Sequence, residues 1–389
     1  MSFLYAATCL TAISLGSLSP ILGTLGDTFA LSSVGIGVIT ASFGLARLIC
    51  DIPAGRMIER FGHRRTFVFG CFIIAIGQGL GVAARETPQI VIGQFLVGIG
   101  YAMTTLTVIS VAVAHTGVAG RVWRGNLVEL MIIFGAVVGT NFGGLLATTI
   151  GWRGAFALAS VAAALAGSLI TIAPWPLQYV RAYGLIHDSH HAILGIRVSP
   201  PAFPWGTAVL LATNFCLGIT WSGYLMTHVP LFAATVLRIR PDQIGRILGL
   251  GLAVDGVLLV VVGRLSNRLS QPGMLSGGLL ILASSIAMLP FTHGYAGMVL
   301  VGILLGSGHC IWMIPSGLLV EIHRSGRVDR LLALQRLVLD LSFTASPLFL
   351  GWGISRFGYG PTSGLTIVVL LVVVFSVMVI RIPQLDVRR

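Results

Sequence analysis

The sequence predicts an all-α polytopic membrane protein with twelve transmembrane helices in two pseudo-symmetric bundles of six. Three observations support this fold class. Of the 389 residues, 56% are hydrophobic and only 9% are charged, whereas about a quarter of the residues in soluble domains are charged. Apolar runs of the roughly 20 residues that a spanning helix needs recur along the whole chain. Short motifs of the first half also recur, in the same order, in the second half.

Each long apolar run, bounded by polar residues, glycine or proline, is expected to form one helix. In the first half these runs lie at about 4–25, 33–55, 66–84, 88–114, 125–149 and 153–173. Residues 174–205 carry five prolines among polar residues, a composition typical of a linker. The second half has its runs at about 206–233, 241–263, 273–290, 295–318, 330–353 and 361–380. We therefore expect bundles over 1–173 and 206–389, joined by the linker 174–205.

The basic residues predict the orientation of the chain in the membrane. All of them are arginine, and the net charge is +12. They concentrate in alternate connections, near 56–65, 121–124, 181–197, 264–268, 324–330 and 381–389. Because cytoplasmic loops retain positive charge, these connections, the linker and both termini are expected to be cytoplasmic, in a bacterial plasma (inner) membrane. The charge is thus a topology signal, and nucleic acid is not an expected partner.

Internal repeats relate the two halves. Gly55-Arg56-Met57-Ile58-Glu59-Arg60-Phe61 recurs, 208 residues later, as Gly263-Arg264-Leu265-Ser266-Asn267-Arg268-Leu269. Gly143-Gly144 followed by Gly151-Trp152-Arg153 resembles Leu350-Gly351 followed by Gly358-Tyr359-Gly360, 207 residues later. Similar order at nearly one offset indicates two related six-helix bundles. Transporters built from such repeats hold their substrate near the bilayer midplane, between the halves.

The segment 55–65 is the densest cluster of charge in the chain. We expect a short basic loop between two helices, with a glycine at each end to allow a tight turn. Its motif residues are Gly55, Arg56, Glu59, Arg60, Gly62, Arg64 and Arg65. The segment resembles the first motif of the major facilitator superfamily, Gly-x-Leu-Ala-Asp-Arg-x-Gly-Arg-Lys/Arg, with Glu59 for the Asp and His63 for an Arg. It serves either as a topology anchor or as a latch between the two halves, with Glu59 paired to the start of the eleventh helix.

The predicted fifth helix carries a second family motif. Its glycines resemble the Gly-x-x-x-Gly-Pro-x-x-Gly-Gly of antiporters, with Thr140 in place of the proline; they are Gly135, Gly139, Gly143 and Gly144. The segment 152–156, Trp-Arg-Gly-Ala-Phe, resembles the Trp-Arg-x-x-Phe of the drug/proton antiporter branch. In the fourth helix, Gln94 stands where proton-coupled members have the arginine of Arg-x-x-Gln-Gly. The resemblance covers essentially the whole chain and implies the major facilitator fold and efflux, without coupling through that arginine.

Charged residues inside apolar runs are costly in a bilayer and therefore indicate function. They are Arg47, Glu129, Asp255, Arg336 and Asp340. Arg47 and Asp255 occupy equivalent positions of the repeat, roughly 12 Å inside the cytoplasmic boundary at 1.5 Å rise per residue. The family fold implies that Arg47 can meet Asp340. We hypothesise that the five form a network that holds the outward-facing state and weakens when a carboxylate is protonated. A static ion-pair cluster and direct substrate contact are the alternatives.

Other polar residues within the runs are candidates to line a cavity, although each can instead be a packing residue: Gln94, Asn141, Asn214, Trp221 and His309. In the linker, His187, Asp188, His190 and His191 are weak evidence for a metal site, so we predict none. The five cysteines lie in apolar runs without metal-ligand spacing and are read as core residues. Without a nucleophile triad or a phosphate loop, the chain is not expected to be an enzyme.

These features predict a monomeric secondary transporter that works in the lipid bilayer by alternating access. The favoured function is proton-coupled efflux of a small organic compound, a drug or a metabolite. No cofactor is expected beyond the proton gradient. The alternative is proton-coupled uptake of a small metabolite or organic anion. Gln94 and Thr140, which depart from the antiporter motifs, keep that alternative open.

Overall fold

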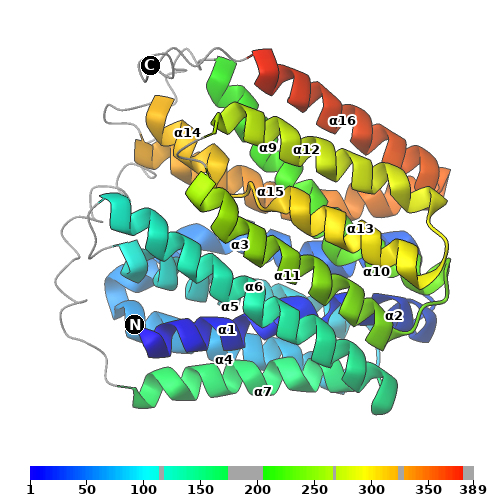
Figure 1. Ribbon diagram of the computed structural model, residues 1–389. Coiled ribbons are helices and arrows are strands. Elements are labelled where there is room, and N and C mark those ends of the chain that lie inside the picture. Colours follow the sequence, from blue (N-terminus) through cyan, green and yellow to red (C-terminus); the bar gives the residue numbers. More distant parts are fainter. Residues whose placement is uncertain (114–117, 174–204, 266–268, 323–327, 380–389) are drawn as a thin grey trace.

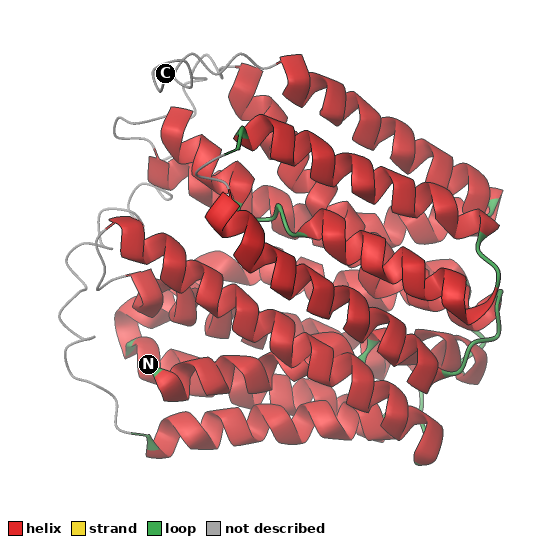
Figure 2. Ribbon diagram, viewed as in Figure 1, coloured by secondary structure: helices red, strands yellow, loops and turns green. Residues whose placement is uncertain are grey.

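The computed structural model describes residues 1–113, 118–173, 205–265, 269–322 and 328–379. Within these ranges the chain is helical apart from short connections, with no strand (Figure 2). Twelve segments of the described residues are long and apolar enough to cross a membrane, which confirms the predicted fold class. The expected domain limits stay a prediction, since residues 174–204 of the linker lie outside the described ranges.

The first six spans run in alternating directions along the bundle, whose long helices lie across the view in Figure 1. Pro20 breaks the first span into three pieces, because proline interrupts the helical hydrogen-bond ladder. The elements are α1 (Ser2–Ser17), η1 (Ser19–Ile21), α2 (Leu22–Thr28), α3 (Ser33–Phe61), α4 (His63–Ala83), α5 (Thr87–Val113), α6 (Val118–Thr149) and α7 (Arg153–Ile172).

The last six spans follow from Trp205 and include a π-helical segment in their first member. In that segment the Thr227 hydroxyl donates to the Ser222 carbonyl, and His228 Nδ1 lies 2.9 Å from the Gly223 carbonyl, both five residues back. The elements are α9 (Trp205–Gly218), η3 (Ile219–His228), α10 (Val229–Thr235), α11 (Pro241–Leu265), α12 (Gln271–Met288), η4 (Leu289–Phe291), α13 (Gly294–His309), α14 (Ile314–Ile322), α15 (Val328–Phe357) and α16 (Tyr359–Val379).

The predicted basic loop 55–65 is wrong in its extent. Helix α3 continues through Phe61, and α4 begins at His63, so only Gly62 lies between them. Gly62 has φ of +83°, a conformation that glycine adopts at little cost and that ends helices. Gly55 is buried inside α3 and makes no turn. The longer helix places Arg47 at the middle of α3 and further from its end than the sequence suggested.

Helices of the two halves meet along two seams, α3 against α15 and α6 against α11. At the end of the bundle where α2 joins α3, glycine lets the backbones touch. A Cβ added to Gly37 would lie 3.1 Å from the Pro347 carbonyl carbon, and one added to Gly245 would lie 3.1 Å from that of Thr140. Gly37 and Gly245 are equivalent in the repeat, so the two seams close this end in the same way.

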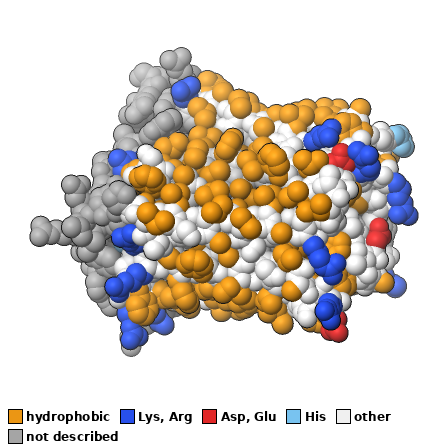
Figure 3. Space-filling model, turned by 90° about the horizontal axis from the view of Figure 1, so that it is seen from below, with side chains coloured by type: hydrophobic (Ala, Val, Ile, Leu, Met, Phe, Trp, Pro, Cys, Tyr) orange, Lys and Arg blue, Asp and Glu red, His pale blue; other side chains and the backbone are white. Residues whose placement is uncertain are grey.

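The outer surface is apolar in the middle and charged at both ends. Figure 3 shows hydrophobic side chains across the centre of one face and arginines toward its two rims. Large apolar side chains that face outward near the middle of their helices include Val161 of α7, which is 59% exposed, and Val368 of α16, which is 57% exposed. A band of this kind is what contact with lipid requires of a membrane-spanning bundle.

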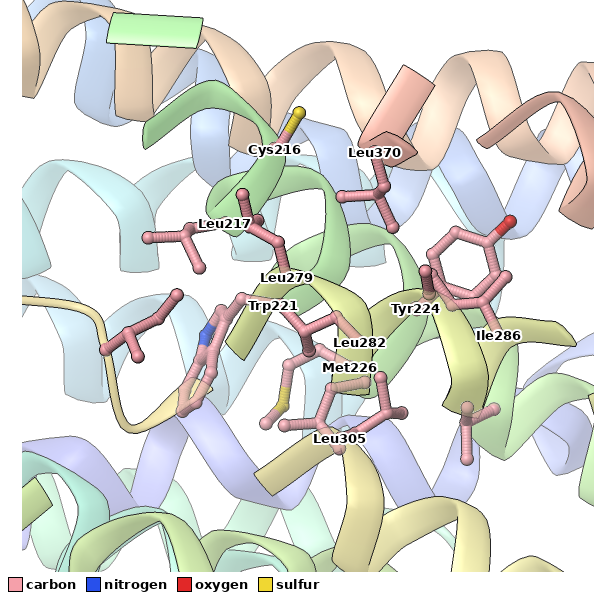
Figure 4. Close-up of a cluster of buried hydrophobic side chains, with 14 of the residues drawn as sticks. Cys216, Leu217, Trp221, Tyr224, Met226, Leu279, Leu282, Ile286, Leu305 and Leu370 are labelled. Atoms are coloured by element: carbon pink, nitrogen blue, oxygen red, sulfur yellow. The ribbon is translucent and has the colours of Figure 1, made fainter. Parts of the chain in front are cut away.

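The π-helical segment η3 lies in the core of the second half. Figure 4 shows Trp221 and Tyr224 projecting from it in different directions among leucines of other helices. Tyr224 is buried, and its hydroxyl donates to Thr366 Oγ1 on α16 at 2.9 Å. Trp221 instead reaches the space between the two halves. A π-helix shifts the register of side chains and is frequent at functional sites, which fits this placement.

Candidate functional site

A central cavity of about 320 Å³ lies between the two halves, with walls from both. Four charged side chains reach it, one each from α3, α6, α11 and α15: Arg47, Glu129, Asp255 and Arg336. The remaining wall is mostly apolar or aromatic, and it comprises Leu15, Tyr101, Thr105, Ile109, Ile132, Ile133, Asn214, Trp221, Leu259, Trp312, Met313, Ser316, Leu332, Gln335, Leu339 and Phe343.

Arg47 and Asp340 form an ion pair between the halves, the contact that the family resemblance implied. Arg47 Nη2 lies 2.6 Å from Asp340 Oδ1, and the two side chains are 9% and 1% exposed. The Arg47 guanidinium also sits over the rings of Phe43, Tyr101 and Phe343, at 5.7, 5.5 and 5.1 Å from their centroids. Cation–π contact of this kind, in a desolvated place, helps to fix the cation between the two helices.

Arg336 pairs with a residue that the sequence analysis missed, Asp51 on α3. Its Nε lies 2.5 Å from Asp51 Oδ2 and its Nη2 lies 3.2 Å from Oδ1, a bidentate arrangement. Nη2 also lies 3.5 Å from Thr105 Oγ1 on α5. Two-point contact orients the guanidinium as well as pairing its charge.

The two pairs are reciprocal, and we call these four residues, Arg47, Asp51, Arg336 and Asp340, the α3–α15 clasp. In each helix the arginine precedes the aspartate by four residues, within the same pattern Arg-Leu-x-x-Asp. Residues four apart share one helical face. Since each arginine meets the aspartate of the other helix, α3 and α15 pass each other in opposite directions. The repeated pattern was the sequence signal that could have identified Asp51.

Glu129 and Asp255 form no ion pair with the clasp, but the charge of Arg47 acts on Glu129 and that of Glu129 acts on Asp255, so the five-residue network stays a prediction. Neither carboxylate has an ion-pair or hydrogen-bond partner among the described residues. They lie on α6 and α11, close enough for their charges to interact across that seam. Gly256, next to Asp255, packs on Ile133, with a Cβ there placed 3.3 Å from its Cγ2. The charged site therefore has two parts, a neutral clasp and a pair of carboxylates.

A second cavity of about 130 Å³ lies on the other side of the clasp. Its wall includes Asp51, Arg336 and Asp340, so the clasp separates it from the central cavity. Arg56 and Glu59 of the loop motif also line it. The predicted partner of Glu59, the start of the eleventh helix, falls among side chains that the structure does not describe. Arg60 lies over the ring of Phe61 at 5.4 Å, and no ion pair joins it to an acid in the described part of the chain.

Two arginines of the sequence motifs cap helix ends in the first half. Arg64, at the start of α4, donates to the carbonyls of Ile170, Thr171 and Ala173 at the end of α7. Conversely, Arg153, at the start of α7, donates to two carbonyls at the end of α4. The last carbonyls of a helix lack partners within it, and a cation there is favourable. Arg65 is exposed.

The glycines of the fifth-helix motif provide close packing. Gly135, Gly139 and Gly143 face the backbone of α1, where a Cβ would lie about 3 Å from main-chain atoms. Gly144 faces α11 instead, with a Cβ there placed 3.0 Å from the Pro241 carbonyl carbon. Three members of the motif therefore join helices within one half, and the fourth belongs to the seam between halves.

The five candidate cavity residues divide between several places. Asn214 lines the central cavity and bonds to Gln335 of α15, and Trp221 also lines it. Gln94 lines a smaller cavity of about 50 Å³, which shares Trp221 with the central one. Asn141 and His309 line neither cavity. Asn141 packs against Gly249 in the α6–α11 seam, and the ring of His309 lies behind Trp221, 5.4 Å between centroids.

The histidine-rich segment 187–191 lies outside the described residues. Among the residues that the structure describes, no group of three or more metal-ligating side chains comes together.

A membrane-spanning shell around a cavity with walls from two related bundles defines a polytopic membrane transporter. The chain belongs to the Major Facilitator Superfamily, whose family description matches residues 4–240. Family and fold are those of transporters and not of enzymes, as the sequence predicted.

Curated relatives include exporters and sugar transporters. The chain is 26% identical to an "MFS-type efflux pump" of Mycolicibacterium smegmatis over 82% of its length and 72% of that protein. It is 25% identical to the "Tetracenomycin C resistance and export protein" of Streptomyces glaucescens over 69% of its length and 54% of that protein. It is also 25% identical to the zebrafish "Solute carrier family 2, facilitated glucose transporter member 12" over 49% of its length. The chain spans about a third of the length of that relative, 32%, and of several others it matches.

Solved structures share the fold. A bacterial homolog of the human lysosomal transporter Spinster, described as inward-facing and occupied, superposes with a TM-score of 0.75 at 15% identity, covering 97% of this chain and 95% of that one. A D-xylose-proton symporter superposes with a TM-score of 0.74, also at 15% identity, over 96% and 95%. At this level of identity the likeness concerns the fold alone.

Proposed function

We propose that the protein is a secondary active transporter that exports a small organic compound in exchange for protons, by alternating access. In this proposal the termini are cytoplasmic and the membrane is a bacterial plasma membrane. The observation that carries it is the central cavity, whose walls come from both halves and hold titratable groups. Rocking one half against the other would expose such a cavity to each side in turn.

The clasp and the carboxylates suggest separate roles in this cycle. The clasp joins α3 to α15 through two buried ion pairs, and breaking a buried pair is costly because a charge is left uncompensated. It would therefore define one of the two end states. Glu129 and Asp255 lack such partners and face the cavity, so they are the groups that would exchange protons with it. A transporter without an arginine at position 94 would then couple through the α6–α11 seam.

Export is favoured over uptake by two observations. The relative aligned over the greatest share of both chains among those described above is named an efflux pump. Three of the four glycines of the fifth-helix motif pack closely on α1, as the antiporter motif implies. Proton-coupled uptake is the second candidate, because sugar and polyol transporters are also among the relatives: "Myo-inositol transporter 2" of Schizosaccharomyces pombe is 30% identical over 49% of this chain.

The test is proton movement in proteoliposomes that contain the full chain and a pH-sensitive dye. An imposed pH gradient is followed while lipophilic and anionic compounds are added one at a time. Under antiport, a compound dissipates the gradient as it moves against the protons. If the compound and the protons move in the same direction, the export proposal is rejected in favour of proton-coupled uptake.

Variants link the flux to the site. Asp255→Asn and Asp340→Asn are expected to abolish coupled flux while the protein still inserts in the membrane. Asp27→Asn is the matched control, because Asp27 is an exposed carboxylate remote from the cavity. Coupled flux at the wild-type rate in both Asp255→Asn and Asp340→Asn would rule out the proposed roles of these two carboxylates.

A further inference from the structure

The cavity of about 50 Å³, which we call the outer chamber, adjoins the central cavity. The two share Leu15, Trp221 and Phe343, so these side chains form a common wall. From this wall the outer chamber extends to Ser19 of η1, toward the end of the bundle where α2 joins α3. That end faces outward if the termini are cytoplasmic, as in the function proposed above, on which this inference rests.

The far limit of the outer chamber lies near the axis that relates the two halves. There the Ser19 hydroxyl donates to Met226 Sδ at 3.3 Å, and both residues line the chamber. They are 207 residues apart, which is an offset of the internal repeat. Two equivalent residues can touch only near the axis between their repeats, where transporters of this kind hold their substrate path. The outer chamber therefore belongs to that path and not to the packing of one half.

The π-helical segment η3 supplies both limits of the outer chamber. A π-helix bonds residues five positions apart, as in the contact of Thr227 with Ser222. Trp221 and Met226 are also five apart, so they lie on nearly one face of the segment, whereas an α-helix would turn them roughly 140° from each other. Figure 4 shows both pointing away from Tyr224. The segment thus places Trp221 at the common wall and Met226 at the axis.

The outer chamber has a polar wall without charge. Gln94 is 3% exposed, and its Nε2 has no hydrogen-bond partner among the described residues. Five hydroxyl groups also line the chamber; each donates its proton elsewhere, and its oxygen can still accept. They belong to Ser14, Ser19, Thr40, Ser222 and Thr227. A polar cavity with an unpartnered buried donor is a place for ordered water, and this volume holds roughly three or four molecules.

We propose that the outer chamber holds a chain of ordered water molecules that conducts protons from the outer side to the carboxylates of the central cavity. Water donates and accepts, so it joins the Gln94 amide to the hydroxyl oxygens. In the described part of the chain no charged side chain lines the chamber, whereas an arginine in a narrow passage repels protons. The chamber is too small for an organic compound. The common wall separates the water from Glu129 and Asp255, so protons pass only when that wall opens.

Hydroxyl-radical footprinting of the full chain in lipid nanodiscs tests for the water. Radicals formed from bound water oxidise the nearest methionine, so Met226 reports on the outer chamber. Met103 and Met298 are the controls, because they are 2% and 0% exposed and line none of the three cavities. We expect Met226 to be oxidised at least fivefold faster than either control. Thr40→Leu, which fills the chamber, should abolish this difference, and Thr40→Val, which keeps the shape of threonine, should retain most of it.

Proton flux in proteoliposomes tests the conduction. Gln94→Arg places a positive charge in the chamber and should slow compound-driven proton movement at least tenfold. Gln94→Met, which is similar in size and uncharged, should slow it by no more than about threefold. Slow oxidation of Met103 and Met298 in Gln94→Arg shows that this variant is folded. Oxidation of Met226 no faster than the controls, or proton movement in Gln94→Arg at the wild-type rate, would overturn the proposal.

Failure of this inference is distinguishable from failure of the proposed function, because footprinting needs neither a proton gradient nor a transported compound. Fast oxidation of Met226 in a chain that moves no protons keeps the water site and rejects both its conduction and the proposed coupling. Slow oxidation of Met226 in a chain that exchanges a compound for protons rejects the outer chamber as the proton path and leaves the transporter.

Discussion

The Arg47–Asp340 pair provides the most direct test of how the halves are held together. Asp340→Asn removes the carboxylate and leaves the Arg47 guanidinium, 9% exposed, without its counter-charge. Two unit charges about 4 Å apart interact by roughly 4 kcal/mol at an effective dielectric constant of 20. Breaking one partner of a buried pair costs about 3–5 kcal/mol. Since about 1.4 kcal/mol is a factor of ten, the arrangement with α3 on α15 should lose more than a hundredfold in population.

A double-mutant cycle separates this pairing energy from other effects of the substitutions. Arg47→Gln and Asp340→Asn are each expected to destabilise the clasped arrangement, whereas the combined variant should recover most of the loss because no unpaired charge remains buried. The populations are read as spin-label distances between Phe61→Cys and Leu269→Cys, in a chain whose five native cysteines are replaced. Both labelled residues are exposed, and they occupy equivalent positions at one end of the two halves.

The outcome that refutes the reasoning is specific. If both single variants keep the wild-type distance distribution, the pair does not hold the halves together. If the combined variant shows the sum of the single effects, the two side chains act independently and the 2.6 Å contact contributes no coupling energy. Either result would show that the Arg47–Asp340 pair does not hold α3 to α15.

Three further predictions concern other parts of the molecule. Asp51→Asn should lengthen the same spin-label distance, and adding Arg336→Gln should restore it, since this pair mirrors the first; no recovery would show that the second pair is not equivalent. Arg64→Met should lower the free energy of unfolding by roughly 1.5–3 kcal/mol per lost charged hydrogen bond at the end of α7. Arg64→Lys should recover part of this loss, because it keeps the charge. If the Met and Lys variants have the same thermal unfolding temperature, the capping role is contradicted. Gly245→Leu should separate α6 from α11, because even its Cβ would lie 3.1 Å from the Thr140 carbonyl carbon; an unchanged distance between spin labels on Ile150→Cys and Val236→Cys, two exposed positions at that end, would show that the contact is not tight.

Twelve spans were predictable because a bilayer requires about 20 apolar residues for each, and the chain has few charges to obscure them. The pairing of Arg47 with Asp340 followed from the family fold. The local details, such as where one helix ends and which charges pair, were harder to predict from the sequence. The end of α3 was placed too early because Gly55 was read as a turn, although a buried glycine also serves close packing. With that boundary Asp51 lies only four residues before the predicted helix end, and it was not included among the buried charges.

The π-helical segment η3 and the partition of the charges needed the structure for a different reason. A π-helix bonds each residue to the one five positions away, so its side chains do not follow the α-helical period. No strong local sequence signal announces it, and the direction of Trp221 could therefore not be assigned from helical periodicity. Glu129 and Arg336 are equivalent in the repeat and opposite in charge, but equivalence in the repeat does not bring two residues together. Their partners depend on which helices face each other across the seams, and the repeat alone does not determine that.

The two seams are therefore expected to respond differently when a carboxylate in the cavity is protonated. Along α3 and α15, each charge has an opposite charge within 2.6 Å, and the net charge is zero. Along α6 and α11, two carboxylates lie close enough for their like charges to repel, and neither forms an ion pair among the described residues. A proton that binds one of these carboxylates removes this repulsion and leaves the clasp intact. We expect binding to draw α6 toward α11 at the level of Glu129, so that the occupied cavity narrows on one side while α3 and α15 act as the fixed side.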